Sequence, residues 1–98
     1  MKLYIVDNYG RIKAGQDTNI AYTIDRNAAI NAVKADWEHL TEKEQKRIGN
    51  KYAVSVYEVP EELHNLNPKN IASEMIDMGL MESDSDRCDA FVIDASNI

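Results

Sequence analysis

Three short runs of β-branched, aromatic and other apolar residues lie far apart in this chain, and stretches with helical periodicity separate them. The runs are KLYIVD at residues 2–7, YAVSVYEVP at residues 52–60 and CDAFVIDAS at residues 88–96. Their composition is typical of strands. Strands that are joined through helices favour a two-layer α+β sandwich. We therefore expect a three- or four-stranded, mainly antiparallel sheet with helices on one face, in the order β(β)-α-α-β-α-β.

Length and composition are those of one small globular domain. The chain has 98 residues, of which 44% are hydrophobic and 29% charged, so we expect a single domain over residues 1–98. No apolar run approaches the roughly 20 residues that span a bilayer, and Asp7 interrupts the short apolar stretch at the N-terminus, unlike a signal peptide. A single cysteine cannot form an internal disulfide. We therefore expect a cytoplasmic protein with no membrane partner.

The clearest helical pattern begins after Asp25, whose carboxylate can accept a hydrogen bond from a first-turn amide. Apolar residues then recur at helical spacing, at Ala29, Val33, Trp37 and Leu40. This single stripe predicts a helix with one buried side, and it predicts that Trp37 is a core residue.

Two further helices are expected from their capping signals. Thr41 and Glu44 have the spacing of a capping box, in which each side chain accepts a hydrogen bond from the other residue's amide. Asn67 and Pro68 are typical of a cap and a first helical position. The buried side of this last helix is expected to comprise Ile71, Ala72, Met75, Ile76 and Met78.

The stretch between the first strand and the first helix is ambiguous. Asn8 and Gly10 indicate a turn, because both tolerate the positive φ that tight turns require. A short returning strand then fits either residues 11–13 or residues 20–23.

The net charge of −6 belongs entirely to the last quarter of the chain. Residues 1–73 carry ten acidic and ten basic side chains, whereas residues 74–98 carry seven acidic side chains against Arg87 alone. Such a segment repels nucleic acid and attracts basic surfaces through long-range, salt-sensitive forces. The alternative is a solvated surface with no partner. The residues expected to contact a partner are Glu74, Asp77, Glu82, Asp84, Asp86 and Asp89.

A metal site is an alternative use of the same segment. Asp84, Asp86 and Cys88 alternate like the first ligands of a calcium loop. However, Asp89 stands where that pattern needs glycine, and Ala95 stands where it needs a glutamate. We therefore predict neither a metal nor any other cofactor, while metal binding at this loop stays the alternative.

Catalytic motifs are missing from the sequence. Neither of the glycine-rich phosphate-binding patterns occurs. His39, His64 and Cys88 have none of the close spacings of zinc sites or local nucleophile–base pairs. We therefore expect a protein that is not an enzyme and has no catalytic residues.

Residues 22–60 resemble small, uncharacterised acidic proteins carried by phages and conjugative elements of Gram-positive bacteria. Three short patterns carry the resemblance: Asp25, Arg26, Ala29 and Ile30; Asp36, Trp37, Leu40, Thr41 and Glu44; and Tyr57, Glu58 and Val59. Similar acidic proteins from such elements include anti-CRISPR and antirestriction inhibitors, which bind the DNA-contacting surface of a nuclease with carboxylates in place of phosphates. The resemblance implies an anti-defence inhibitor that acts as a DNA mimic, but it implies no catalytic residue.

Two classes of function follow from the sequence. The first is a non-enzymatic protein that binds the basic surface of another protein, such as a defence nuclease, and makes no direct contact with nucleic acid. The second is the metal-binding domain. A structural phage protein that self-associates, as a homodimer formed through an open strand edge, is a third interpretation.

Overall fold

The computed structural model describes residues 1–15 and 17–98, which fold around one four-stranded sheet. The strands are β1 (Lys2–Asp7), β2 (Asn19–Thr23), β3 (Lys51–Glu58) and β4 (Asp89–Asp94). Their order across the sheet is β2-β1-β3-β4, and every neighbouring pair is antiparallel. The α+β prediction is confirmed. The returning strand is the one at residues 20–23, whereas residues 11–13 lie in a 3-10 helix.

The helices begin at the predicted caps. They are α1 (Arg26–His39), α2 (Glu42–Ile48) and α3 (Pro68–Asp77), with short 3-10 helices η1 (Tyr9–Ala14), η2 (Glu61–Leu63), η3 (Asp84–Asp86) and η4 (Ala95–Asn97). Asp25 accepts a hydrogen bond from the Asn27 amide, and Asn67 accepts one from the Asn70 amide. The capping box of Thr41 and Glu44 is formed in both directions. In the described part of the chain, no helix has the length and apolar character to cross a membrane.

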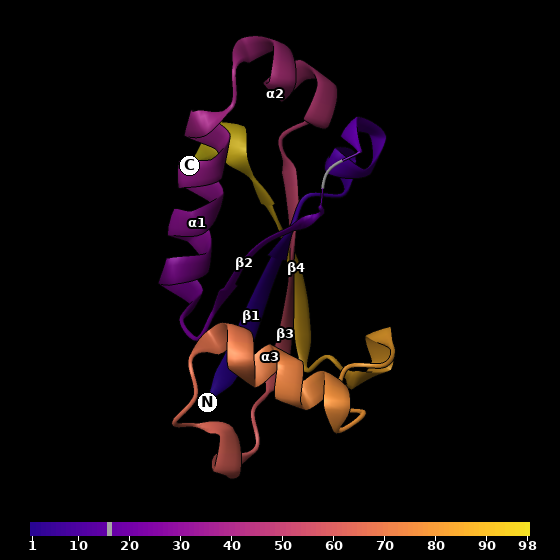
Figure 1. Cartoon of the computed structure of the whole chain (residues 1–98). Helices are drawn as coiled ribbons and strands as arrows, with labels where there is room; N and C mark the ends of the chain where they lie inside the picture. Colours follow the sequence, from indigo (N-terminus) through magenta and orange to yellow (C-terminus); the bar gives the residue numbers. More distant parts are fainter. Residues whose placement is uncertain (16) are drawn as a thin grey trace.

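The two faces of the sheet are covered differently (Figure 1). On one face, α1 packs over a core that includes Val6, Tyr52 and Val54. Leu3 and Ile5 alternate with Val6 along β1 and therefore belong to the opposite face, where they pack in a second core with α3 residues. The expected single helical layer therefore holds for α1, whereas α3 lies against the other face at one end of the sheet.

The buried side of α3 is narrower than predicted. Ile71, Ala72 and Met75 are buried, as expected. Ile76 and Met78 are instead exposed, at 59% and 45% of their surface. A ten-residue helix that contacts only one end of the sheet buries a narrow stripe, and residue 76 lies about 100° around the helix from residue 75. The prediction that Ile76 and Met78 are core residues is therefore wrong. Trp37 is partly buried against the α1 core.

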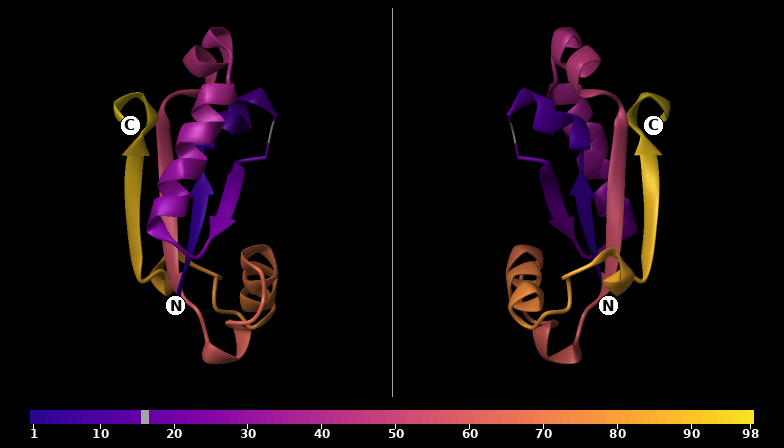
Figure 2. Two further views of the ribbon diagram at one scale, coloured as in Figure 1. Left: turned by 90° about the vertical axis from the view of Figure 1, so that its left-hand side faces the viewer. Right: turned by 90° about the vertical axis from the view of Figure 1, so that its right-hand side faces the viewer.

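Much of the face opposite α1 carries no helix. Figure 2 shows α3 and the segment that follows it at one end of this face, and η1 at the other end, with β3 and β4 uncovered between them. Val92, which lies opposite Ala53 in the β3–β4 register, is 66% exposed there. The long edge of the sheet at β4 is open in the same view.

Candidate functional site

All six acidic residues predicted to contact a partner are exposed and lie near one end of the molecule. Glu74 and Asp77 lie in the C-terminal half of α3. Glu82, Asp84 and Asp86 belong to the segment that connects α3 to β4, and Asp89 is the first residue of β4. We call these six residues the acidic surface.

Three carboxylates of the acidic surface also have local structural roles. Asp86 accepts hydrogen bonds from the amides of Glu82 and Ser83, at 3.0 and 3.1 Å. Asp84 forms an ion pair of 3.6 Å with Arg87. Asp89 accepts a bond of 2.9 Å from the Ala90 amide. Asp86 therefore closes the connecting segment on itself, which gives the other carboxylates a defined position.

Exposed apolar side chains occur in the same stretch of the chain as these carboxylates. Ile76, Met78 and Leu80 are 59%, 45% and 36% exposed. Because residues spaced by three and four share a helix face, Glu74, Asp77 and Met78 lie side by side. The sequence did not reveal this mixture, because the spacing of the apolar residues on α3 was equally consistent with burial. Apolar side chains with a charged surround are typical of protein interfaces.

The alternative metal site finds no support in the described residues. No three histidine, cysteine, aspartate or glutamate side chains of residues 1–15 and 17–98 form a group that could hold a metal ion. One oxygen of Asp86, a proposed ligand, already accepts two backbone hydrogen bonds. The Cys88 thiol is exposed.

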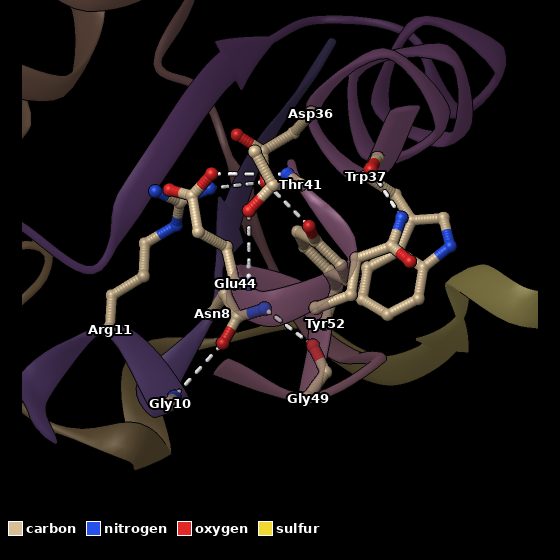
Figure 3. Close-up of polar contacts among 10 residues, drawn as sticks. Asn8, Gly10, Arg11, Asp36, Trp37, Thr41, Glu44, Gly49 and Tyr52 are labelled. Atoms are coloured by element: carbon tan, nitrogen blue, oxygen red, sulfur yellow. Dashed lines mark hydrogen bonds and ion pairs between the residues drawn. The ribbon is translucent and has the colours of Figure 1, made fainter. Parts of the chain in front are cut away.

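A polar cluster holds η1 against the rest of the fold at the opposite end (Figure 3). The buried Asn8 side chain accepts a bond from the Gly10 amide at 2.9 Å and donates one to the Gly49 carbonyl at 3.2 Å. These contacts join η1 to the loop that connects α2 with β3. A methyl group at Gly10 would lie only 1.8 Å from the Ile48 carbonyl oxygen. Glycine at position 10 is therefore required by the close packing of two backbone segments.

A partly buried carboxylate forms the centre of the same region. One oxygen of Asp36 accepts from both the Arg11 guanidinium and the Tyr52 hydroxyl. Burial and the bond to Asp36 raise the pKa of Tyr52 to about 12. The cluster links η1, α1 and β3, and its groups are neutralised or hydrogen-bonded to one another. It is therefore explained by the fold.

An apolar groove lies between η1 and the uncovered strands. Its volume is about 440 Å³, and its lining includes Tyr9, Ile48, Ala53 and Val92. Tyr9 and Val92 are 57% and 66% exposed. In the sheet register, the small Ala53 lies between Asp7 of β1 and Val92 of β4. Its size is within the range of ligand-binding sites.

Asp7 is a buried carboxyl group at the end of the first strand. It ends β1 and is only 7% exposed. Burial raises its pKa to about 6, and the nearby Asp17 carboxylate adds to the increase. Burial, together with Asp17 and Asp7, also raises the pKa of Tyr22. No general base or nucleophile partner of Asp7 is evident among the described residues, so its main consequence is for stability.

Comparison of the chain with protein-family models, curated proteins and solved structures finds no match. Its function is therefore inferred from its own surfaces.

Proposed function

We propose that this domain binds another protein and catalyses no reaction, and that the acidic surface and its exposed apolar residues make the contact. The observation that carries this proposal is the position of six exposed carboxylates near one end of the molecule, with the exposed Met78 beside Glu74 and Asp77 on α3. The apolar side chains supply area that a partner can bury. The carboxylates supply steering toward a basic partner.

The partner that fits this surface has a basic rim around an apolar contact. Residues 74–98 carry the whole net charge of −6, so attraction to a basic surface extends over about a Debye length of 8–10 Å. A nucleic acid would be repelled by the same charge. A defence nuclease is the partner class that agrees with the resemblance of residues 22–60 to proteins of mobile elements. In that case the carboxylates occupy the place of DNA phosphates, and the protein is an anti-CRISPR or antirestriction inhibitor in the cytoplasm.

The test is capture of a partner from bacterial lysate by two variants of equal charge. The first variant carries Glu74→Gln, Glu82→Gln and Asp84→Asn, and leaves Asp86 to hold its segment in place. The matched control removes three exposed carboxylates elsewhere, with Glu38→Gln, Glu61→Gln and Glu62→Gln.

We expect the first variant to bind the captured protein about tenfold more weakly or worse, while the control binds like the unmodified protein. A short DNA duplex should compete with this domain for the partner if the carboxylates replace phosphates. Equal loss in both variants, or no loss in either, would show that the acidic surface is not the binding site.

A further inference from the structure

We propose that the open edge of β4 is a second binding site, which accepts one extended peptide strand with an apolar residue at its centre and a basic residue near its C-terminal end. The site adjoins the acidic surface, with which it shares Asp89, but it is built from the backbone of β4 and the apolar groove beside it. Strand addition at a sheet edge is a common form of peptide recognition.

The backbone geometry of β4 leaves one row of groups available. β4 pairs with β3 on one side, and in the described chain no strand pairs with its other side. The amide of Ala95 donates to the Asn50 carbonyl at 2.8 Å. This bond shows that the backbone groups of Ala95, and of every second residue before it, point toward β3. Along β4, residues whose backbone groups bond to β3 alternate with residues whose backbone groups point away from β3. The backbone groups of Ala90, Val92 and Asp94 therefore point toward the open edge.

The outer edge is only partly blocked. The Ala90 amide is already bonded to the Asp89 side chain. The amide and carbonyl of Val92 form the centre of the remaining row. A residue paired with Val92 would place its side chain on the same face of the sheet. That face is the uncovered one, where Val92 borders the groove of about 440 Å³. An apolar side chain therefore fits best at this position.

The charged side chains around β4 favour one kind of partner strand. The strand contains Asp89 and Asp94 and no basic residue. Asp94 is already neutralised by Lys51 at 2.8 Å and also accepts from Asn50 and Ser96. Asp89 is therefore the carboxylate of β4 that attracts a basic partner. A second copy of this chain that paired through β4 would bring two segments of net charge −6 together, and like charges oppose that contact. A strand with a basic residue opposite Asp89 is complementary instead.

The register gives the sequence of a test peptide. In an antiparallel pair, the residue two before the one facing Val92 lies opposite Asp94, and the residue three after it lies opposite Asp89. The peptide Thr-Thr-Ile-Thr-Thr-Lys places threonine opposite the paired Asp94, isoleucine opposite Val92 and lysine opposite Asp89. Its controls are Thr-Thr-Ile-Thr-Thr-Glu, which reverses the charge at that end, and Thr-Thr-Ser-Thr-Thr-Lys, which removes the apolar centre.

Titration of the full-length protein, followed by amide NMR shifts at low salt, tests the proposal. We expect saturable shifts at residues 89–94 and at the groove, and binding about tenfold tighter for the first peptide than for either control. Val92→Lys should abolish these shifts. Because Val92 is exposed, this variant should keep the amide spectrum of the core, and Val92→Thr should bind more weakly but still detectably.

Equal binding of basic-ended and acidic-ended peptides, or shifts confined to α3, would overturn the proposal, as would no saturable binding at millimolar peptide. A dimer in sedimentation that Val92→Lys dissociates would also overturn it, because the edge would then belong to a second copy. The variants Glu74→Gln in α3 and Glu82→Gln in the connecting segment should leave peptide binding unchanged, so failure here is distinguishable from failure of the proposed function.

Discussion

At the scale of single residues, the ionised carboxylate of Asp7 is unfavourable in the folded state because it is buried. Its carboxyl group is 7% exposed, and burial raises its pKa to about 6 from an ordinary value of 3.8. A carboxyl group whose pKa is higher in the folded state favours folding when it is protonated. Its contribution is therefore fully present below pH 3.8, is lost as the pH rises toward 6, and stays lost above that pH.

Asp7→Asn removes this ionisation. We expect the free energy of unfolding of the variant to exceed that of the unmodified protein by an amount that grows between pH 4 and pH 6. The difference should reach up to about 3 kcal/mol at pH 7.5. Urea unfolding of both proteins at a series of pH values measures the difference, and other carboxylates cancel in the comparison. A stability difference that does not change between pH 4 and pH 7 would contradict the assigned environment of Asp7.

Tyr52 provides a second measurement at the scale of one residue. Tyr52→Phe removes the hydroxyl that donates to Asp36 but leaves the Arg11 contact to the same carboxylate. We expect a loss of about 1.5 kcal/mol in the free energy of unfolding, as for hydrogen bonds to charged groups. Tyr9→Phe is the control, because Tyr9 is 57% exposed. Equal effects of the two substitutions would mean that the Tyr52 hydroxyl contributes nothing to the cluster.

At the scale of the elements, the position of η1 depends on Gly10. Gly10→Ala places a methyl group against the Ile48 carbonyl oxygen, which is backbone and cannot rotate away. We expect a loss of about 1–3 kcal/mol in stability and altered amide shifts around the groove that η1 borders. Gly15→Ala is the comparison, because its methyl group would meet open space and only the φ of +69° opposes the substitution. It therefore separates backbone strain from a steric clash. Gly10→Ala with an unchanged groove would show that η1 tolerates displacement.

Elements with local signals were predictable from the sequence, and those that depend on distant contacts were not. The capping box of Thr41 and Glu44 requires only residues three apart, so its spacing was sufficient. The contact of Arg11 with Asp36 joins residues 25 positions apart, and no spacing rule indicates it. The choice between residues 11–13 and 20–23 for the returning strand was also decided by tertiary pairing with β1.

The candidate site was predictable in charge but not in shape. The concentration of carboxylates after residue 73 is a property of the sequence. The exposure of Ile76 and Met78 depends on where α3 meets the sheet, because the helix buries only the side that faces Leu3 and Ile5. The sequence places apolar residues on α3 but does not say how wide its contact with the sheet is.

At the scale of the whole molecule, the fold places the polar cluster and the acidic surface at opposite ends. The polar cluster of Asp36 and Tyr52 ties η1, α1 and β3 together at one end. The acidic surface lies at the other end, where α3 and the connecting segment leave the sheet (Figures 1 and 2). The open edge of β4 runs between them. Substitutions of exposed carboxylates should therefore change binding without unfolding the domain.

The central claim is that the acidic surface binds a basic protein, and the salt dependence of that binding tests it most directly. The affinity for the captured partner should be measured across a salt series for three proteins: unmodified, the Glu74/Glu82/Asp84 variant and the Glu38/Glu61/Glu62 control. We predict that affinity falls with salt for the unmodified protein and the control, and that this dependence is much shallower for the first variant. The same slope in all three proteins would contradict the claim.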